Sequence, residues 1–253
     1  MPVLAVIPAR LGATRLPRKP LRLLGGAPLI TRVWERVQAI GLADVVVVAT
    51  DAREIATAVA EAGGRAVLTS SAHPSGTDRV AEVCQRQEYE GYDVVLNVQG
   101  DEPFVSEAAL LGTLDMVRER GFLLGTAAAV AGEAIRDRPD VVKVLCADDG
   151  AALYFSRAPI PFLRDHSDLP LLGRQVRQHI GIYAYRREAL LRWVALPVHP
   201  LEQIERLEQL RPLAAGMRMG VALVETPPPG GIDTEDDLER ANALWTDLYA
   251  GRT

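Results

Sequence analysis

Residues 44–68 read DVVVVATDAREIATAVAEAGGRAVL, and this one segment carries the signals of a strand, a helix and a second strand. Four consecutive valines favour a strand at residues 44–49 that is buried on both faces. Asp51, with Glu54 three residues later, is the pattern of a capping box that opens a helix reaching residue 60. Residues 66–68 form the second strand. This order predicts parallel strands joined by a crossover helix.

The same alternation continues on both sides of this segment. Further strands are predicted at residues 2–7 and 93–98, and further helices at residues 28–39, 77–88 and 106–120. Ser75 or Thr77 caps the second of these helices, and Ser106 opens the third. The order predicts an α/β fold with a doubly wound parallel sheet, whose ligands lie outside the carboxyl ends of the strands.

The second half of the chain is less regular. Strands are predicted at residues 125–131, 141–146, 178–185 and 221–225, and helices at residues 201–214 and 234–249. Prolines interrupt the connection between residues 159 and 170, and PPPGG at residues 227–231 predicts a stiff turn before the last helix. Because no shift in composition marks a linker, we expect a single domain over residues 1–253 with an inserted subregion at about residues 151–190.

Composition excludes several classes of protein. Of 253 residues, 48% are hydrophobic and 24% charged, so the chain can bury a core and is not predicted to be disordered. The net charge of −5 argues against a general nucleic-acid binder, so any bound anion needs a local cluster of cations. Cys84 and Cys146 form no C-x-x-C pair, which favours unpaired thiols and a cytoplasmic location. No signal peptide or membrane span is predicted.

A cationic loop follows the first strand. Residues 8–21 read PARLGATRLPRKPL and place four cations, Arg10, Arg15, Arg18 and Lys19, within ten positions. Cations so close repel one another unless an anion lies among them, so a polyphosphate site is predicted; the alternative is a solvated basic loop. The loop matches neither the Walker A nor the GxGxxG pattern, which disfavours a dehydrogenase.

Two acidic segments suggest a divalent cation. Asp101 and Glu102 follow the strand at residues 93–98, where Mg²⁺ would find carboxylates and substrate oxygens; the alternative is an ordinary turn before a helix. In the run DTEDD at residues 233–237, helix capping and the helix dipole explain most of the acids. Asp233 precedes the cap and is therefore free to face a metal. The four histidines show no zinc spacing.

These residues belong to motifs that resemble one family, the bacterial 3-deoxy-manno-octulosonate (Kdo) cytidylyltransferases, or CMP-Kdo synthetases. The shared motifs follow one another through nearly the whole chain: IPARLGATRLPRKPL (7–21), VATD (48–51), HPSGTDRVAE (73–82), NVQGDEP (97–103), VVKVL (141–145), ALYFSRAPIP (152–161), HIGIYAYR (179–186), LEQIERLEQLR (201–211) and GIDTEDDLE (231–239). ALYFSR, HIGIYAYR and LEQIERLEQLR point to the Kdo enzymes, whereas the first motif and QGDEP also suit relatives that activate other sugars.

The resemblance implies a Rossmann-like nucleotidyltransferase fold with a mixed, mostly parallel sheet flanked by helices. It implies that CTP and Kdo react to give CMP-Kdo and pyrophosphate, with Mg²⁺, in a homodimer, for lipopolysaccharide biosynthesis. Residues 157–178 resemble the family's dimerisation and lid region. Neither nucleic acid nor a membrane is an expected partner.

The resemblance also implies roles for particular residues. Arg10, Arg15 and Lys19 would bind the CTP phosphates, and Asp101 and Asp233 would bind Mg²⁺; Arg10, Lys19 and the two aspartates form the expected catalytic group. The cytosine and ribose would be lined by Pro8, Ala9, Ser75 and Gly76. The sugar side would comprise Gln99, Arg157, Arg164, His179, Tyr183, Glu208 and Gln209. The sugar carboxylate would be bound by Arg157 or Arg164 together with His179.

Three positions depart from the family pattern. Arg18 stands where glycine is usual, Arg138-Pro139-Asp140 replaces Asn-Pro-Asn, and Val198-His199-Pro200 replaces a turn that contains serine. None removes an expected ligand, but the last leaves the sugar open. The alternatives are CMP transfer to another acidic sugar, such as 8-amino-Kdo or sialic acid, and a non-enzymatic nucleotide-binding protein on the same fold.

Overall fold

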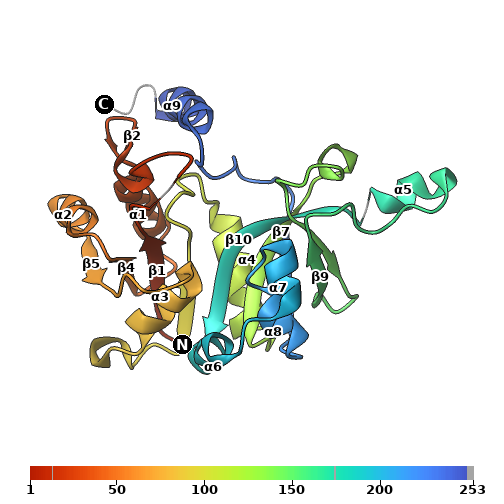
Figure 1. Cartoon of the computed structure of the whole chain (residues 1–253), viewed down its shortest axis with the longest axis horizontal. Helices are drawn as coiled ribbons and strands as arrows, with labels where there is room; N and C mark the ends of the chain where they lie inside the picture. Colours follow the sequence, from red (N-terminus) through yellow and green to blue (C-terminus); the bar gives the residue numbers. More distant parts are fainter. Residues whose placement is uncertain (13, 174, 250–253) are drawn as a thin grey trace. The chain divides into compact units, whose positions relative to one another are not determined.

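The chain packs as two compact units, each assembled from separate pieces of sequence. The computed structural model describes residues 1–12, 14–173 and 175–249 (Figure 1). The N-terminal unit comprises Pro2–Tyr92, Asn97–Val105 and residues 229–249. The central unit comprises Met1, Asp93–Leu96 and Ser106–Pro228. A single domain with an insertion at about residues 151–190 stays a prediction, because this division concerns packing and not independent folding.

The N-terminal unit is built on a parallel sheet in the order β1-β4-β5. Its strands are β1 (Val3–Ala9), β4 (Val45–Thr50) and β5 (Arg65–Leu68), with a hairpin of β2 (Leu23–Leu24) and β3 (Ala27–Pro28). Its helices are α1 (Leu29–Ile40), α2 (Arg53–Glu61), α3 (Gly76–Cys84) and α9 (Glu235–Tyr249), with 3-10 helices at Lys19–Leu21 and Gln87–Tyr89. Residues 46–50 are buried, as expected for a strand covered on both faces.

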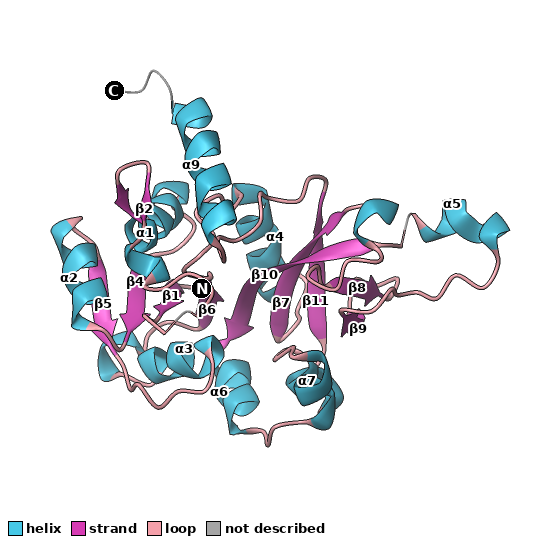
Figure 2. Cartoon of the chain, turned by 45° about the horizontal axis from the view of Figure 1, so that its top comes forward, coloured by secondary structure: helices cyan, strands magenta, loops and turns pink. Residues whose placement is uncertain are grey.

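The central unit contains a mixed sheet in the order β11-β7-β10-β6 (Figure 2). β7 (Leu124–Val130) is parallel to β11 (Met219–Val224) and antiparallel to β10 (Arg177–Arg186). β6 (Val94–Asn97) follows, and β8 (Lys143–Cys146) pairs with β9 (Ala152–Ser156) and with β10. Its helices are α4 (Glu107–Arg118), α5 (Leu169–Leu172), α6 (Arg187–Ala195), α7 (Pro200–Glu205) and α8 (Leu210–Ala214), with 3-10 helices at Glu133–Ile135 and His166–Asp168.

Close packing of α4 on this sheet depends on glycine. A Cβ on Gly125 of β7 would lie 2.5 Å from the carbonyl oxygen of Thr113, inside contact distance. The predicted α/β class, with a mixed and mostly parallel sheet flanked by helices, is confirmed. Among the described residues, no helix is both long and apolar enough to cross a membrane.

The predicted helix at residues 201–214 is wrong as a single helix. It is divided into α7 and α8 by Arg206, whose φ of 56° is left-handed. Glu202 of α7 and Arg211 of α8 form a buried ion pair, with Arg211 Nε 2.7 Å from Glu202 Oε2. This tertiary contact folds the two short helices against each other, which an unbroken helical periodicity does not predict.

The predicted cap at Asp51 is also wrong. Helix α2 begins after Ala52, and the Ala52 N–H donates to Thr50 Oγ1 at 3.2 Å. Asp51 instead accepts a bond from Arg79 Nη2 at 3.0 Å. The caps predicted at Ser75 and Ser106 are confirmed, since each hydroxyl accepts a backbone N–H of its helix. α3 ends at Cys84, earlier than predicted, and neither β9 nor α6 was predicted.

Candidate functional site

Lys19 lies between two aspartates from distant parts of the N-terminal unit. Its Nζ is 2.5 Å from Asp101 Oδ2, just past β6, and 2.9 Å from Asp233 Oδ1, just before α9. Arg15 Nη2 donates to the other oxygen of Asp233 at 2.9 Å. We call Arg15, Lys19, Asp101, Glu102 and Asp233 the Lys19 cluster. The structure thus brings together two cations of the loop and both predicted metal ligands.

The turn before α9 packs against the segment that carries Asp101. The Ile232 N–H donates to the Asp101 carbonyl oxygen at 3.0 Å. A Cβ on Gly231 would lie 2.9 Å from Glu102 Oε1, so glycine leaves the room that this carboxyl occupies. Backbone packing therefore brings the two acidic segments together.

Helix capping directs the Asp233 side chain. Thr234 Oγ1 accepts the Asp237 N–H at 3.2 Å, and Asp237 Oδ2 accepts the N–H groups of Asp233 and Thr234 at 3.1 and 2.9 Å. Asp237 and Thr234 thus close the helix end between them. The carboxylate of Asp233 lies outside the cap, as the sequence predicts, and it faces Lys19.

The charges of the Lys19 cluster shift the pKa values of Lys19 and Glu102. Burial disfavours the Lys19 ammonium, but Asp101 and Asp233 outweigh it and raise the pKa of Lys19 above its ordinary value. Burial, followed by repulsion from Asp101 and Asp233, raises the pKa of Glu102 to about 8. At neutral pH, Glu102 is therefore mostly protonated, and one ammonium faces two carboxylates.

Asp101 and Asp233 also fit a divalent cation. Both carboxylates converge on one point, the position of the Lys19 ammonium, so the geometry already accommodates a positive charge there. The described residues contain no group of three or more His, Cys, Asp or Glu side chains suited to a metal. Two carboxylates completed by substrate oxygens and water are the set that Mg²⁺ accepts.

The residues expected around the nucleoside pack closely. A Cβ on Gly76 would lie 3.3 Å from Pro8 Cγ and 3.9 Å from Gln99 Oε1. A Cβ on Gly100 would lie 2.8 Å from the Pro8 carbonyl oxygen and 3.5 Å from Ala9 Cβ. Gln99, expected on the sugar side, therefore lies among the residues expected around the nucleoside.

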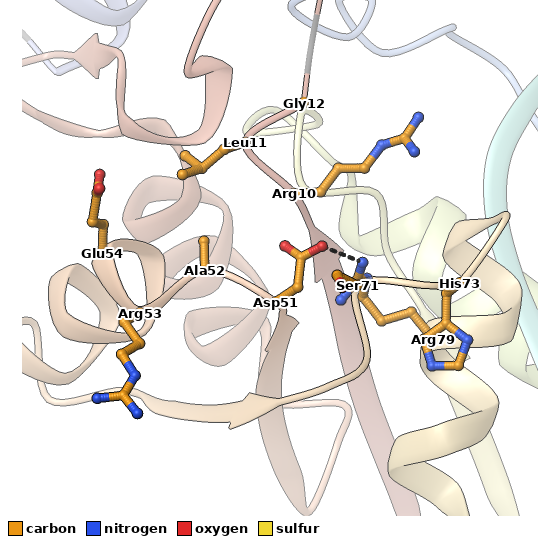
Figure 3. Close-up of a pocket in the computed structure, with 10 residues that line it drawn as sticks. All are labelled: Arg10, Leu11, Gly12, Asp51, Ala52, Arg53, Glu54, Ser71, His73 and Arg79. Atoms are coloured by element: carbon orange, nitrogen blue, oxygen red, sulfur yellow. Dashed lines mark hydrogen bonds and ion pairs between the residues drawn. The ribbon is translucent and has the colours of Figure 1, made fainter.

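A cavity of about 540 Å³ opens beside this group (Figure 3). It is lined by Arg10, Leu11, Gly12, Asp51, Ala52, Arg53, Glu54, Ser71, His73 and Arg79. Arg10 is exposed at this cavity, whereas Arg79 is buried and bridges Asp51, at 3.0 Å, and Thr69 Oγ1, at 2.5 Å. Sequence reasoning missed this bridge, because its partners lie far apart in the chain.

Two aromatic rings of the central unit lie against His179. Its ring centre lies 4.9 Å from that of Phe155 and 5.6 Å from that of Tyr183, which in turn stacks on Tyr185. Burial lowers the pKa of His179 to about 3, so the ring is neutral at physiological pH. A neutral ring offers hydrogen bonds, but no positive charge, to a ligand beside it.

One such bond fixes the proton of His179. Thr126 Oγ1 lies 2.9 Å from His179 Nε2 and donates its single proton to the Ile182 carbonyl oxygen at 2.8 Å. The Nε2 atom must then donate to Thr126, which leaves Nδ1 as an acceptor. Thr126 is a further residue that sequence reasoning missed.

The other expected sugar-side residues are distributed over the central unit. Burial, then Tyr185 and Glu208, raises the pKa of Tyr183 well above its ordinary value, which places the Glu208 charge within reach of this ring. Arg157 donates to the carbonyl oxygens of Glu205 at 3.0 Å and Pro139 at 3.1 Å. Arg164 is exposed, and Gln209 is buried at the start of α8.

Lys143 anchors the segments around Arg157. This lysine is fully buried, and its Nζ donates to three carbonyl oxygens, of Arg138 at 2.8 Å, Val141 at 2.8 Å and Arg157 at 2.5 Å. The three protons of the ammonium are thereby used. Burial lowers the pKa of Lys143 from its ordinary value.

Known proteins match this chain along its whole length. A family model described as cytidylyltransferase covers residues 4–219. A 3-deoxy-manno-octulosonate cytidylyltransferase of Gemmatimonas aurantiaca is 60% identical over all of this chain and 98% of that protein. Another, of Rhodospirillum centenum, is 50% identical over 95% of this chain and 92% of that protein.

Solved structures share the fold of this chain. A CMP:2-keto-3-deoxy-manno-octonic acid synthetase complexed with CTP has a TM-score of 0.90 and 36% identity, over 98% of this chain and 100% of that one. A 4-diphosphocytidyl-2C-methyl-D-erythritol synthase of Anaerococcus prevotii, at 16% identity and a TM-score of 0.63, shares the fold alone.

Proposed function

Because the chain belongs to the 3-deoxy-manno-octulosonate cytidylyltransferase family, we propose that it transfers CMP from CTP to the anomeric hydroxyl of Kdo and releases pyrophosphate. The observation that carries the proposal is the Lys19 ammonium between Asp101 and Asp233, at the end of a cationic loop. The product would serve lipopolysaccharide biosynthesis.

Asp101 and Asp233 would hold Mg²⁺. When bound, the ion would polarise the α-phosphate and lower the pKa of the attacking hydroxyl. The support is the convergence of both carboxylates on one cation position. Lys19 would turn from the carboxylates towards the phosphates, and its raised pKa keeps it charged for this role.

The loop residues would neutralise the leaving group. The anomeric oxygen attacks the α-phosphorus and gives its proton to water, while the bond from this phosphorus to the bridging oxygen breaks and the electron pair leaves with pyrophosphate. Arg10, Arg15 and Lys19 would offset the charge that develops there, so positioning and charge neutralisation account for catalysis. This route needs no covalent enzyme intermediate.

The nucleoside would be bound by the residues at the end of β1 and the start of α3. Pro8, Ala9, Ser75 and Gly76 are proposed to line the cytosine and ribose, with Gln99 beside them. The cavity next to Arg10 gives this end of the substrate room to enter.

The central unit would bind the sugar. We assign the carboxylate of Kdo to Arg157 or Arg164, and its hydroxyls to His179, Tyr183, Glu208 and Gln209. The neutral His179 ring, with Nδ1 as acceptor, suits a hydroxyl better than a carboxylate. We also propose a homodimer, and a cytoplasmic location because CTP is supplied there.

Pyrophosphate release tests the proposed function. We would supply each of the four nucleoside triphosphates with Mg²⁺, and combine each with Kdo, 8-amino-Kdo, sialic acid or no sugar. Release that requires both CTP and Kdo is expected, and the Asp233→Asn variant should abolish it. Release with CTP and another sugar would change the substrate. No release from a folded protein that binds CTP would favour the non-enzymatic alternative.

A further inference from the structure

Helix α9 is fastened to the β2–β3 hairpin by a small set of contacts (Figure 1). Asn242 Oδ1 accepts the Gly25 N–H at 2.9 Å, and Asn242 Nδ2 donates to the Leu23 carbonyl oxygen at 3.1 Å. Trp245 lies directly on the hairpin turn, because a Cβ on Gly25 would be 2.2 Å from Trp245 Nε1. The Arg32 guanidinium lies 4.7 Å from the Trp245 ring centre and donates to the Gly25 carbonyl oxygen at 2.6 Å.

These contacts matter because α9 buries little apolar surface. Among its described side chains, Leu238 and Ala241 are the buried ones, at 5% exposure each. A surface helix normally depends on burying one apolar face. The position of this fifteen-residue helix therefore depends on its hydrogen bonds and on the contacts of Trp245, with the hairpin and with Phe104, whose ring centre lies 6.2 Å away.

The same interface adjoins the Lys19 cluster through both of its partners. On the hairpin side, Lys19 precedes Arg22 by three residues; on the helix side, Asp233 precedes Glu235 by two. Arg22 and Glu235 form an ion pair, with Arg22 Nη1 2.9 Å from Glu235 Oε2. Docking of α9 thus adds a second restraint on Asp233, beside the bond from the Ile232 N–H to the Asp101 carbonyl oxygen.

We propose that Asn242 and Trp245 are positioning residues, which hold the Asp233 carboxylate beside Asp101 by docking α9 on the hairpin. This inference rests on the proposed function, in which Asp233 binds the divalent cation. Neither residue belongs to the cluster itself, and in this proposal its effect passes through Asp233. When α9 is released, the stiff segment before Ile232 stays attached, but the second carboxylate is no longer fixed.

A pair of glycine variants tests the Trp245 contact. Gly25 and Gly26 both have left-handed φ values, +55° and +81°, so alanine strains the backbone at either position. Only at Gly25 would the added Cβ strike Trp245; at Gly26 it would enter open space among the described residues. The EPR signal of unbound Mn²⁺ measures the Mn²⁺ affinity of the protein without nucleotide. This affinity should fall about tenfold in Gly25→Ala, because loss of a contact that supports a metal ligand weakens metal binding by about that factor. Gly26→Ala should bind Mn²⁺ like the parent, and equal losses in both would overturn the proposal.

A second pair tests whether the effect passes through Asp233. Asn242→Ala should weaken Mn²⁺ binding about tenfold, whereas Glu239→Ala, an exposed site on the same helix, should not. In an Asp233→Asn background, Asn242→Ala should cause no further loss, because its target is gone. The same further loss in that background would overturn the positioning role.

The Asp233→Asn protein also separates the two proposals. If Asp233→Asn binds Mn²⁺ as tightly as the parent, the metal role of Asp233 fails, and the positioning role fails with it. If Asp233→Asn loses affinity while Gly25→Ala and Asn242→Ala do not, the positioning role alone fails. Hydrogen exchange at residues 232–238, measured without metal, should rise in Asn242→Ala and not in Glu239→Ala; equal exchange in both would contradict docking by Asn242.

Discussion

Replacing Asp101 with asparagine should remove catalysis and leave the fold intact. The substitution keeps the size and shape of the side chain and removes one negative charge from the Lys19 cluster. Lys19 retains Asp233 at 2.9 Å, so its ammonium keeps a partner. The exchange therefore tests the charge of Asp101 and not its packing.

The substitution should change stability little and kcat strongly. The side chains of Lys19 and Asp101 are 16% and 27% exposed, so the pair is largely buried, but Lys19 keeps Asp233 and asparagine keeps an oxygen acceptor. Loss of the charge should therefore cost about 1–2 kcal/mol of stability. Loss of the Asp101 charge also relieves the repulsion that helps raise the pKa of Glu102, which offsets part of that cost. A preorganised charge at the reacting centre contributes about 3 kcal/mol, so kcat should fall at least about 10²-fold.

The assay combines pyrophosphate release with urea unfolding. Turnover is measured with saturating CTP and Kdo while Mg²⁺ is raised to saturation, and unfolding is measured without metal. Asp236→Asn, at an exposed acid in the first turn of α9, is the matched control and should keep kcat within about twofold of the parent. Turnover of Asp101→Asn within about threefold of the parent would refute the reasoning, as would a stability loss above about 2 kcal/mol.

Three stability predictions follow from backbone and burial. Arg18 has φ 56°, which costs a side-chain-bearing residue about 1–2 kcal/mol, whereas glycine loses about 0.4–1 kcal/mol more entropy on folding. Arg18→Gly should therefore raise the free energy of unfolding in urea by up to about 1.6 kcal/mol, and a decrease would contradict this. Gly231→Ala would crowd Glu102 and should lower the free energy of unfolding by about 1–3 kcal/mol. Gly230→Ala, in open space among the described residues, should lower it by less than about 0.5 kcal/mol. Equal shifts in melting temperature for the two variants would contradict this prediction. Burial lowers the pKa of His179 from the ordinary 6.5 to about 3 in the folded protein, so the unfolded chain takes up a proton more readily. The neutral ring therefore stabilises the fold above pH 6.5, and this contribution is lost as pH falls towards 3. Near pH 5 the loss should reach about 2 kcal/mol and be missing from His179→Gln, so parallel pH profiles of unfolding for parent and variant would refute it.

Local signals predicted much of the fold. The valines of β4 and the serine caps at Ser75 and Ser106 act through their immediate neighbours, and the structure confirms them. The predicted helix at residues 201–214 failed because the break at Arg206 is stabilised by a pair nine residues apart in the chain. α6 was missed because Arg186, at its N-terminal end, gives no capping signal.

The candidate site also has features that the sequence predicts and features that it does not. Arg15, Lys19 and Asp233 stand out in the sequence as a crowded cationic loop and an acid outside a helix cap, and the structure brings them into contact. The neutrality of His179 and the protonation of Glu102 depend on burial, which no local pattern reveals. Tertiary structure alone decides such charges.

The Lys143 ammonium has a consequence for how the neighbouring sequence can diverge. Its three partners are main-chain oxygens, which every amino acid supplies, so the anchor does not depend on the side chains at Arg138 or Val141. The sequence of this segment, Arg138-Pro139-Asp140, is one of the three positions that differ from the pattern of the family that the chain resembles. Side chains can change along such a loop while its path persists, as long as the one lysine that binds its backbone is kept.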